Sequence, residues 1–144
     1  MKALLVDTAG WMACADAADP AHAGCCAARD AALESGQTLV ITDFIADETL
    51  TLIRLRLGVA AAETWWDQVD RSARLRWERI DAGRFDQARR LFFQYRDKAF
   101  SFTDCTTFVV MRERRLTQAL TTDHHFKQMR FQVIPAPAPR PRRS

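Results

Sequence analysis

Short apolar runs recur along the chain and are separated by longer segments in which apolar residues have helical spacing. Short apolar runs bounded by polar or small residues are typical of buried strands. On this basis we predict strands over residues 3–6, 38–42, 75–80, 118–122 and 131–134.

The segments between these runs favour helices. An alanine-rich stretch over 14–36 is broken near Pro20 and stops at Ser35 and Gly36. Further helices are predicted over residues 43–58, 61–73, 81–97 and 102–116. Strands that alternate with helices indicate an α/β fold, with a mainly parallel sheet covered by helices on both faces.

Length and composition indicate one folded domain. The 144 residues are 48% hydrophobic and 27% charged, values typical of a globular protein rather than of a disordered chain. We expect this domain to cover residues 1–135 and the Pro/Arg-rich residues 136–144 to form an extended, disordered tail. The net charge of +3 matches the three arginines of this tail, so it is weak evidence for nucleic-acid binding.

The cysteines and the apolar segments exclude several classes of protein. Cys14, Cys25, Cys26 and Cys105 show no CxxC spacing, so neither a zinc site nor a disulfide framework is indicated. No segment approaches the roughly 18 apolar residues of a membrane span. A reducing cytoplasm is therefore the expected compartment.

Acidic residues stand at the ends of predicted strands and near the starts of predicted helices. Asp7 and Asp123 follow strands, whereas Glu48 and Asp104 lie early in helices. Each alone is explained by helix capping, a turn, or the helix dipole. In a parallel α/β sheet, however, these positions share one rim, so the four carboxylates are expected to converge there.

A cluster of carboxylates calls for a cation. Two unit charges 4 Å apart repel by about 1 kcal/mol even in bulk water, and by more near a protein. Oxygen ligands without cysteine suit a hard ion such as Mg²⁺, with Mn²⁺ as an alternative. The adjacent His124 and His125 are left unassigned, because neighbouring histidines in a loop mostly face solvent or pack.

Four segments together resemble a known family. They are "LLVDTAG", "TDFIADETLTLIRLRLG", "SFTDCTTFVVMRERRL" and "ALTTDHHFKQMRFQVIP", in this order over residues 2–135. The set is similar to the PIN-domain family, and specifically to ribonuclease toxins of VapC type. This resemblance implies a three-layer α/β/α sandwich around a central, mainly parallel sheet.

The resemblance also implies roles for the acids. Asp7 and Asp104 would be direct Mg²⁺ ligands, Glu48 and Asp123 would complete the catalytic pocket, and Ser101 would be a supporting hydroxyl. The chain departs from the family at Ala9, where a second hydroxyl is usual.

The implied activity is that of a toxin in a toxin-antitoxin system. It would be a Mg²⁺-dependent endoribonuclease that cleaves RNA, is inhibited by an antitoxin inserting a basic side chain, and forms a homodimer. Candidate dimer contacts are Trp65, Trp66, Phe92 and Phe93, and candidate phosphate-binding residues are Arg54, Arg112 and Arg114.

Two other classes of protein with an acid after the first strand need residues that this chain lacks. An aspartyl phosphotransferase needs a second acid two residues after the first, where this chain has Ala9. A receiver-type phosphoacceptor needs an acidic pair near the first strand, which is missing. The remaining alternative is a catalytically inactive PIN-like module that binds RNA or a partner.

Overall fold

The computed structural model describes residues 2–136, so the predicted tail lies almost wholly outside the described residues. The strands are β1 (Ala3–Val6), β2 (Thr38–Thr42), β3 (Leu75–Glu78), β4 (Gln118–Leu120) and β5 (Gln132–Ile134). The helices are α1 (Thr8–Ala15), α2 (His22–Glu34), α3 (Asp43–Leu57), α4 (Val59–Arg71), α5 (Ala82–Gln94), α6 (Phe102–Glu113) and α7 (His125–Gln128).

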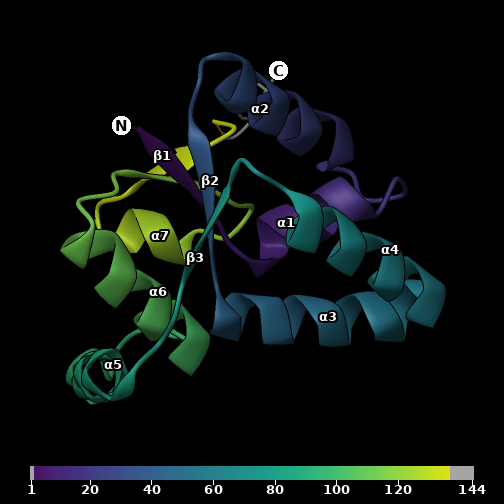
Figure 1. Cartoon of the computed structure of the whole chain (residues 1–144). Coiled ribbons are helices and arrows are strands. Elements are labelled where there is room, and N and C mark those ends of the chain that lie inside the picture. Colours follow the sequence, from purple (N-terminus) through teal and green to yellow (C-terminus); the bar gives the residue numbers. More distant parts are fainter. Residues whose placement is uncertain (1, 137–144) are drawn as a thin grey trace, which may run out of the picture.

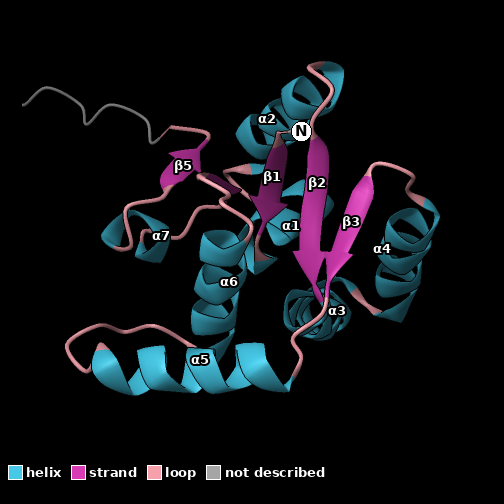
Figure 2. Cartoon of the chain, turned by 60° about the vertical axis from the view of Figure 1, so that its left-hand side comes forward, coloured by secondary structure: helices cyan, strands magenta, loops and turns pink. Residues whose placement is uncertain are grey.

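The five strands form one parallel sheet in the order β3-β2-β1-β4-β5. Helices α1 to α4 lie on one side of the strands and α5 to α7 on the other (Figure 1). Figure 2 shows β1, β2 and β3 side by side, with their arrowheads toward the same end of the sheet. The predicted three-layer α/β/α sandwich with a parallel sheet is therefore confirmed.

The strands form the centre of the core. Leu4, Leu5 and Val6 of β1 are fully buried, as expected for a strand covered on both faces. Phe108 of α6 and Phe126 of α7 are the largest fully buried side chains and close the second face. Within the described residues, every helix is too short or too polar to cross a bilayer.

The predicted strands were located correctly, although β3 and β4 end two residues earlier than expected. The helix predicted over 14–36 was wrong in its first part. Helix α1 begins directly after Asp7, and a loop through Pro20 separates it from α2. Helix α7 was also not predicted, because four residues are too few to show a helical pattern.

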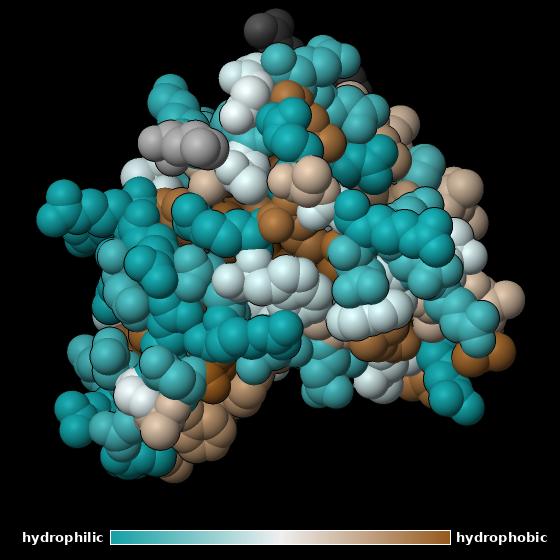
Figure 3. All heavy atoms as spheres, in the orientation of Figure 1, coloured by the Kyte–Doolittle hydropathy of each residue, from teal (hydrophilic) through white to brown (hydrophobic). Residues whose placement is uncertain are grey.

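An apolar groove opens between α1, α2, α3 and α4. It has a volume of about 420 Å³, and its lining includes Trp11, Leu33, Ile53, Leu57 and Trp65. Figure 3 shows hydrophobic atoms in the hollow near the centre of this face, surrounded by hydrophilic ones. We call this feature the apolar groove.

The chain reverses its direction across the sheet between β1 and β4. From β1 the crossovers lead to β2 and β3 on one side, and the later strands β4 and β5 lie on the other. In an open α/β sheet the crevice at such a switch point, beyond the carboxyl ends of the strands, is where ligands bind. Asp7 leaves β1 at this crevice.

Gly10 allows helix α1 to approach β4 closely. A Cβ atom on this residue would lie 2.3 Å from the carbonyl oxygen of Leu120 and 3.1 Å from Cγ1 of Val6. Both neighbours belong to paired central strands and cannot move freely. Only glycine therefore fits here, and its small size sets how closely α1 packs against the switch point.

We predict that Gly10→Ala destabilises the fold by about 1–3 kcal/mol, because the added methyl overpacks against backbone. Urea denaturation followed by circular dichroism measures the effect. Gly83→Ala in α5 is the matched control, since its Cβ would meet only Asp81 Oδ1 at an ordinary 3.6 Å. The control should stay within about 1 kcal/mol of the wild type, and equal stability of the two variants would contradict the prediction.

Candidate active site

Asp7 is both the N-cap of α1 and a buried acid at the switch point. Its Oδ1 accepts a hydrogen bond from the Gly10 amide at 2.9 Å. Its Oδ2 accepts one from the Thr121 hydroxyl, just beyond β4, at 2.7 Å. The residue is only 6% exposed. Capping and a functional role are therefore compatible, since the cap fixes the carboxylate at the crevice.

Asp104 is fixed by a capping box at the start of α6. The Asp104 amide donates to Ser101 Oγ, and the Ser101 amide donates back to Asp104 Oδ2, each at 3.0 Å. Such a reciprocal pair satisfies two helix-terminal amides and restricts the rotamer of the acid. Ser101 thus holds Asp104 in place, and its role as a supporting hydroxyl in the reaction stays a prediction.

Thr121 and His125 connect the acids, and sequence analysis assigned neither. The Thr121 hydroxyl donates to Asp7 and accepts from the Asp123 amide at 2.9 Å. His125 Nδ1 lies 2.9 Å from Asp104 Oδ2 and 3.2 Å from Asp123 Oδ2. The only sequence signal for either residue was its position within two residues of Asp123.

Glu48 lies near the same crevice as Asp7, but on α3, which follows β2 on the other side of the switch point. It lies in the second turn of α3, which starts directly after β2 and is capped by Thr42, whose Oγ1 accepts from the Ile45 amide at 3.0 Å. Immediate entry from strand to helix leaves no loop in which the position of Glu48 could vary.

The four predicted acids line one cavity of about 220 Å³. Strands β1 and β4 are parallel neighbours, so the expected convergence of Asp7 and Asp123 at one rim is observed. The remaining lining includes Thr8, Asp19 and Arg56. We call this space the acidic cavity. The structure brings the predicted residues together, while their catalytic roles remain predictions.

Burial makes the acidic cavity electrostatically unfavourable when its acids are ionised. The pKa of Asp7 is raised to about 7, mainly by burial and also by the charges of Asp123 and Asp104, while hydrogen bonds from Gly10 and Thr121 act in the opposite direction. Burial also raises the pKa of Asp104, against hydrogen bonds from Ser101 and His125. A bound cation would favour the ionised forms.

Two further observations bear on cation binding. Thr8 lines the acidic cavity, and its buried Oγ1 has no hydrogen-bond partner among the described residues. Ligand atoms of Asp123, His124 and His125 lie within 4.8 Å of one another. His125 Nδ1 faces the carboxylates of Asp104 and Asp123, and in the tautomer that carries the hydrogen on Nδ1 it donates to them instead of binding a metal.

The three arginines proposed to hold phosphates lie away from the acidic cavity. Arg54 lines a surface hollow between α3 and α4, and Arg112 lines another beside α5. Arg114 is paired with the buried Glu78, with Nε 2.9 Å from Oε1. On α3, Arg54 and Arg56 face different directions because they are only two positions apart on the helix. The arginine in the lining is Arg56.

Comparison with known proteins supports the fold over nearly the whole chain. Ribonuclease VapC26 of Mycobacterium tuberculosis is 29% identical over 141 residues, which cover 92% of this chain and all of that protein. The 23S rRNA-specific endonuclease VapC20 of the same species is 28% identical over 132 residues, covering 89% of this chain and 95% of that protein.

Solved structures agree. The crystal structure of VapC20, described as a Sarcin-Ricin loop cleaving toxin, superposes with a TM-score of 0.80 at 26% identity and covers 90% of this chain and 96% of that chain. VapBC2 from Rickettsia felis, bound to a DNA fragment from its promoter, gives a TM-score of 0.67 at 10% identity, with 90% of this chain and 96% of that chain covered. At that identity it shows the fold alone.

A family model described as PIN domain matches residues 4–132, a range that contains all four acids of the acidic cavity. Together with the parallel sheet and its switch point, this match establishes that the chain belongs to the PIN-domain family.

Proposed function

We propose that this protein is a metal-dependent endoribonuclease and the toxin of a toxin-antitoxin pair. The observation that carries the proposal is the convergence of Asp7, Glu48, Asp104 and Asp123 on one cavity at the switch point of the sheet. The ribonuclease names of the relatives VapC26 and VapC20 support RNA as the substrate. Because RNA is the proposed substrate, we also propose a cytoplasmic site of action.

The residues present fit a hard divalent cation. Asp7 is buried and Asp104 partly buried, both have raised pKa values, and the hydroxyl of Thr8 in the same lining has no hydrogen-bond partner among the described residues. We propose that Asp7 and Asp104 hold Mg²⁺ or Mn²⁺, whose oxygen preference matches this set. When bound, the ion stabilises charge on the phosphate oxygens and lowers the pKa of a water.

The protein's own side chains would orient the reaction. Glu48 and Asp123 complete the lining and can accept hydrogen bonds from an attacking water. The capped positions of Asp7 and Asp104 hold the carboxylates in one arrangement before substrate arrives. Such preorganisation is worth most in a site partly shielded from water.

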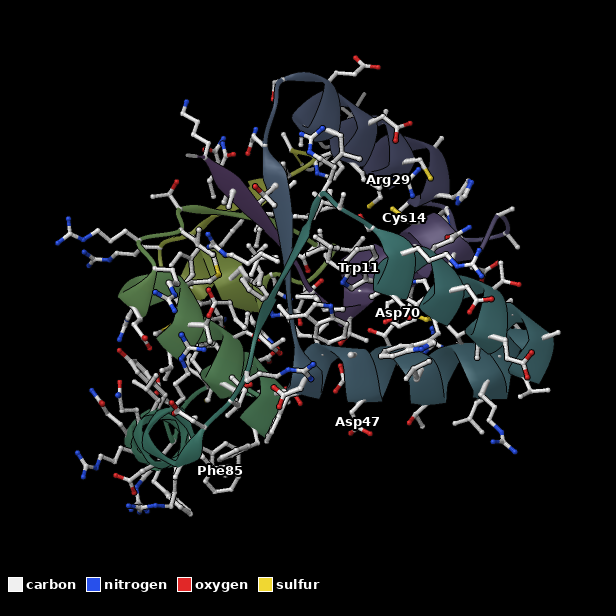
Figure 4. The ribbon with its side chains drawn as sticks, viewed as in Figure 1. Trp11, Cys14, Arg29, Asp47, Asp70 and Phe85 are labelled. Carbon is white, nitrogen blue, oxygen red and sulfur yellow. The ribbon has the colours of Figure 1, made fainter. Side chains whose placement is uncertain are left out.

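An apolar helix of an antitoxin is the proposed occupant of the apolar groove. The groove is lined by Trp11 and Trp65, whose buried indole N–H groups have no hydrogen-bond partner within residues 2–136. Figure 4 shows Trp11, Cys14 and Arg29 around it. Helices α1 and α3 contribute to both this groove and the acidic cavity. One partner can therefore fill the groove and insert a basic side chain among the acids.

A second copy of the chain is the proposed occupant of an exposed aromatic surface. Phe44, Phe85, Phe92, Phe93 and Phe102 contact one another, with ring centroids 4.9–6.3 Å apart, and we call them the phenylalanine face. Phe85 and Phe93 are 47% and 55% exposed, and Figure 4 shows Phe85 at the edge of the molecule. An apolar patch of this kind marks an interaction surface.

One predicted dimer contact was wrong. Trp65 is only 5% exposed and packs against Trp11 inside the fold, with ring centroids 5.7 Å apart. Trp66, the next residue, is partly exposed and contacts Trp77, with ring centroids 5.9 Å apart. The helical turn between neighbouring residues decides which of the two faces the core.

We predict that Asp7→Asn and Asp104→Asn each reduce RNA cleavage by about 100-fold or more, because each removes a charged ligand from the reacting centre. Cleavage of purified total RNA with Mg²⁺, and with EDTA instead, is the measurement. Asn at either position can still accept the capping hydrogen bond, so both variants should fold.

The control is Asp47→Asn, which removes an acid next to Glu48 in sequence. Asp47 is exposed and points away from α3 on its outer side (Figure 4). This variant should cleave like the wild type. Full activity of Asp7→Asn or Asp104→Asn would disprove the proposed metal site, and so would cleavage that persists in EDTA. If the wild type did not cleave RNA at all, the alternative of a binding module would be favoured.

The raised pKa of Asp7 predicts how stability depends on pH without metal. The folded state keeps this proton up to about pH 7, whereas the unfolded chain loses it near 3.8. The stabilisation is thus complete below about pH 4 and is lost as pH rises through 7. When the pH is raised from 5 to 8 in EDTA, the free energy of unfolding of the wild type should fall by on the order of 2 kcal/mol relative to that of Asp7→Asn.

Urea denaturation at both pH values gives this difference, with Asp47→Asn again as the control. Mg²⁺ should restore more stability at pH 8 than at pH 5, because only the ionised carboxylate binds the ion. If the free energy of unfolding changed with pH in the same way in the wild type and in Asp7→Asn, the Asp7 carboxyl group would not be the cause of the pH dependence.

The two proposed surfaces can be tested against each other. Phe93→Ser should convert a dimer into a monomer in light scattering at micromolar concentration, and leave binding of the antitoxin intact. Leu57→Ser, at a 38% exposed position of the apolar groove, should weaken co-purification with a co-expressed antitoxin and leave the dimer intact. A monomeric wild type, or an antitoxin unaffected by Leu57→Ser, would contradict the respective assignment.

A further inference from the structure

Helix α3 runs along the acidic cavity rather than touching it at one point. Glu48, Leu52 and Arg56 follow one another at intervals of four residues, and all three line the cavity. Residues spaced in this way lie on one face of a helix, and the eight steps of the helix from Glu48 to Arg56 span about 12 Å. The cavity is therefore a trough with Glu48 toward one end and Arg56 toward the other.

Among the residues that the structure describes, Arg56 is the only basic one in the lining, which includes five acids: Asp7, Asp19, Glu48, Asp104 and Asp123. No ion pair or side-chain hydrogen bond joins Arg56 to another residue of the described part of the chain, and the side chain is exposed. By contrast, Arg84 and Arg114 are held by carboxylates. The Arg56 guanidinium is thus available to a ligand.

A nucleic-acid strand entering this trough would meet strong repulsion from its acids. A cation held by Asp7 and Asp104 offsets that repulsion at the scissile phosphate only. The next phosphates along the strand need positive charge of their own, and a guanidinium supplies it with a fork of donors that matches phosphate oxygens. The backbone positions of Glu48 and Arg56 lie about 12 Å apart along the helix, so Arg56 stands toward the far end of the trough, where a neighbouring phosphate of the strand would lie.

We propose that Arg56 binds a phosphate of the RNA strand that flanks the scissile bond, and so positions the substrate along α3. The inference rests on the proposed ribonuclease function for the identity of the strand. It makes Arg56 a positioning residue, because it acts on a phosphate that does not react. It also gives the cavity a direction, with the cleaved bond at the Asp7 end.

Asp19 could compete with a phosphate for Arg56 by forming an ion pair with it, since Asp19 lines the same cavity from the loop between α1 and α2. Its Oδ1 accepts a hydrogen bond from the Ala21 amide at 2.8 Å, which fixes the carboxylate to its own loop. No ion pair between Asp19 and Arg56 is formed in the described structure. The arginine is therefore not neutralised across the trough.

Arg54 provides a matched control on the same helix. It lies two residues before Arg56, is exposed in the same way, and lines the hollow between α3 and α4 instead of the acidic cavity. Arg54→Gln and Arg56→Gln remove the same charge from the same turn. A general electrostatic effect on RNA would appear in both variants, and a phosphate contact in the trough only in Arg56→Gln.

The first measurement is binding of a fluorescein-labelled single-stranded RNA of mixed sequence, in Mg²⁺, to the Asp104→Asn variant with each arginine change added. Arg56→Gln should weaken binding about tenfold and reduce the slope of log affinity against log salt by about 0.7, as expected for one lost phosphate contact. Arg54→Gln should leave both unchanged. Arg56→Lys should restore the salt slope, because the charge is retained.

The second measurement is cleavage of total RNA by the otherwise wild-type protein. Arg56→Gln should raise KM with kcat nearly unchanged, while stabilisation by Mg²⁺ stays as in the wild type. Equal behaviour of Arg56→Gln and Arg54→Gln in binding would overturn the proposal even if the wild type cleaves RNA. A wild type that binds RNA without cleaving it would reject the ribonuclease function, while the salt slope would still decide the role of Arg56.

Discussion

The structure depends on a carboxylate buried between two central strands. Asp7 ends β1, and both its oxygens are held, one by the Gly10 amide and the other by the Thr121 hydroxyl. Burying an acid is costly unless it is hydrogen-bonded and its charge is compensated. The close approach of α1 to β4, which requires glycine at position 10, places both donors. The remaining acids then gather around a group that already favours a cation.

The same contacts that end strands and start helices also fix the site. Asp7 caps α1, Asp104 belongs to the capping box of α6, and Asp123 accepts from the His125 amide at 2.9 Å. Each acid is thereby locked into one conformation by local backbone donors before any ligand binds. Capping therefore does not compete with the proposed metal binding, since a capping acid at the rim of a parallel sheet is already held in one position.

The hydrophobic pattern predicted the sheet well and the helices less evenly. All five strands were located. The central strands β1 and β2 appear as nearly continuous apolar runs because helices cover both of their faces, whereas the edge strands β3 and β5 are partly exposed and include polar residues. Helix α1 was missed as a separate element, because it is buried on several sides and has no polar face to reveal its period. The loop through Pro20 was visible in the sequence as a break, although its effect on the preceding helix was not.

The sequence by itself determined the α/β class, the strand positions and the four acids that now line one cavity, because each depends on local pattern or on a motif in chain order. Only the tertiary structure decided which other side chains join them. Thr121 and His125 bridge acids that are far apart in the chain, and Arg56 rather than Arg54 enters the cavity because of its rotation about α3. Such choices depend on distances across the sheet and on helix orientation, which a linear pattern does not contain.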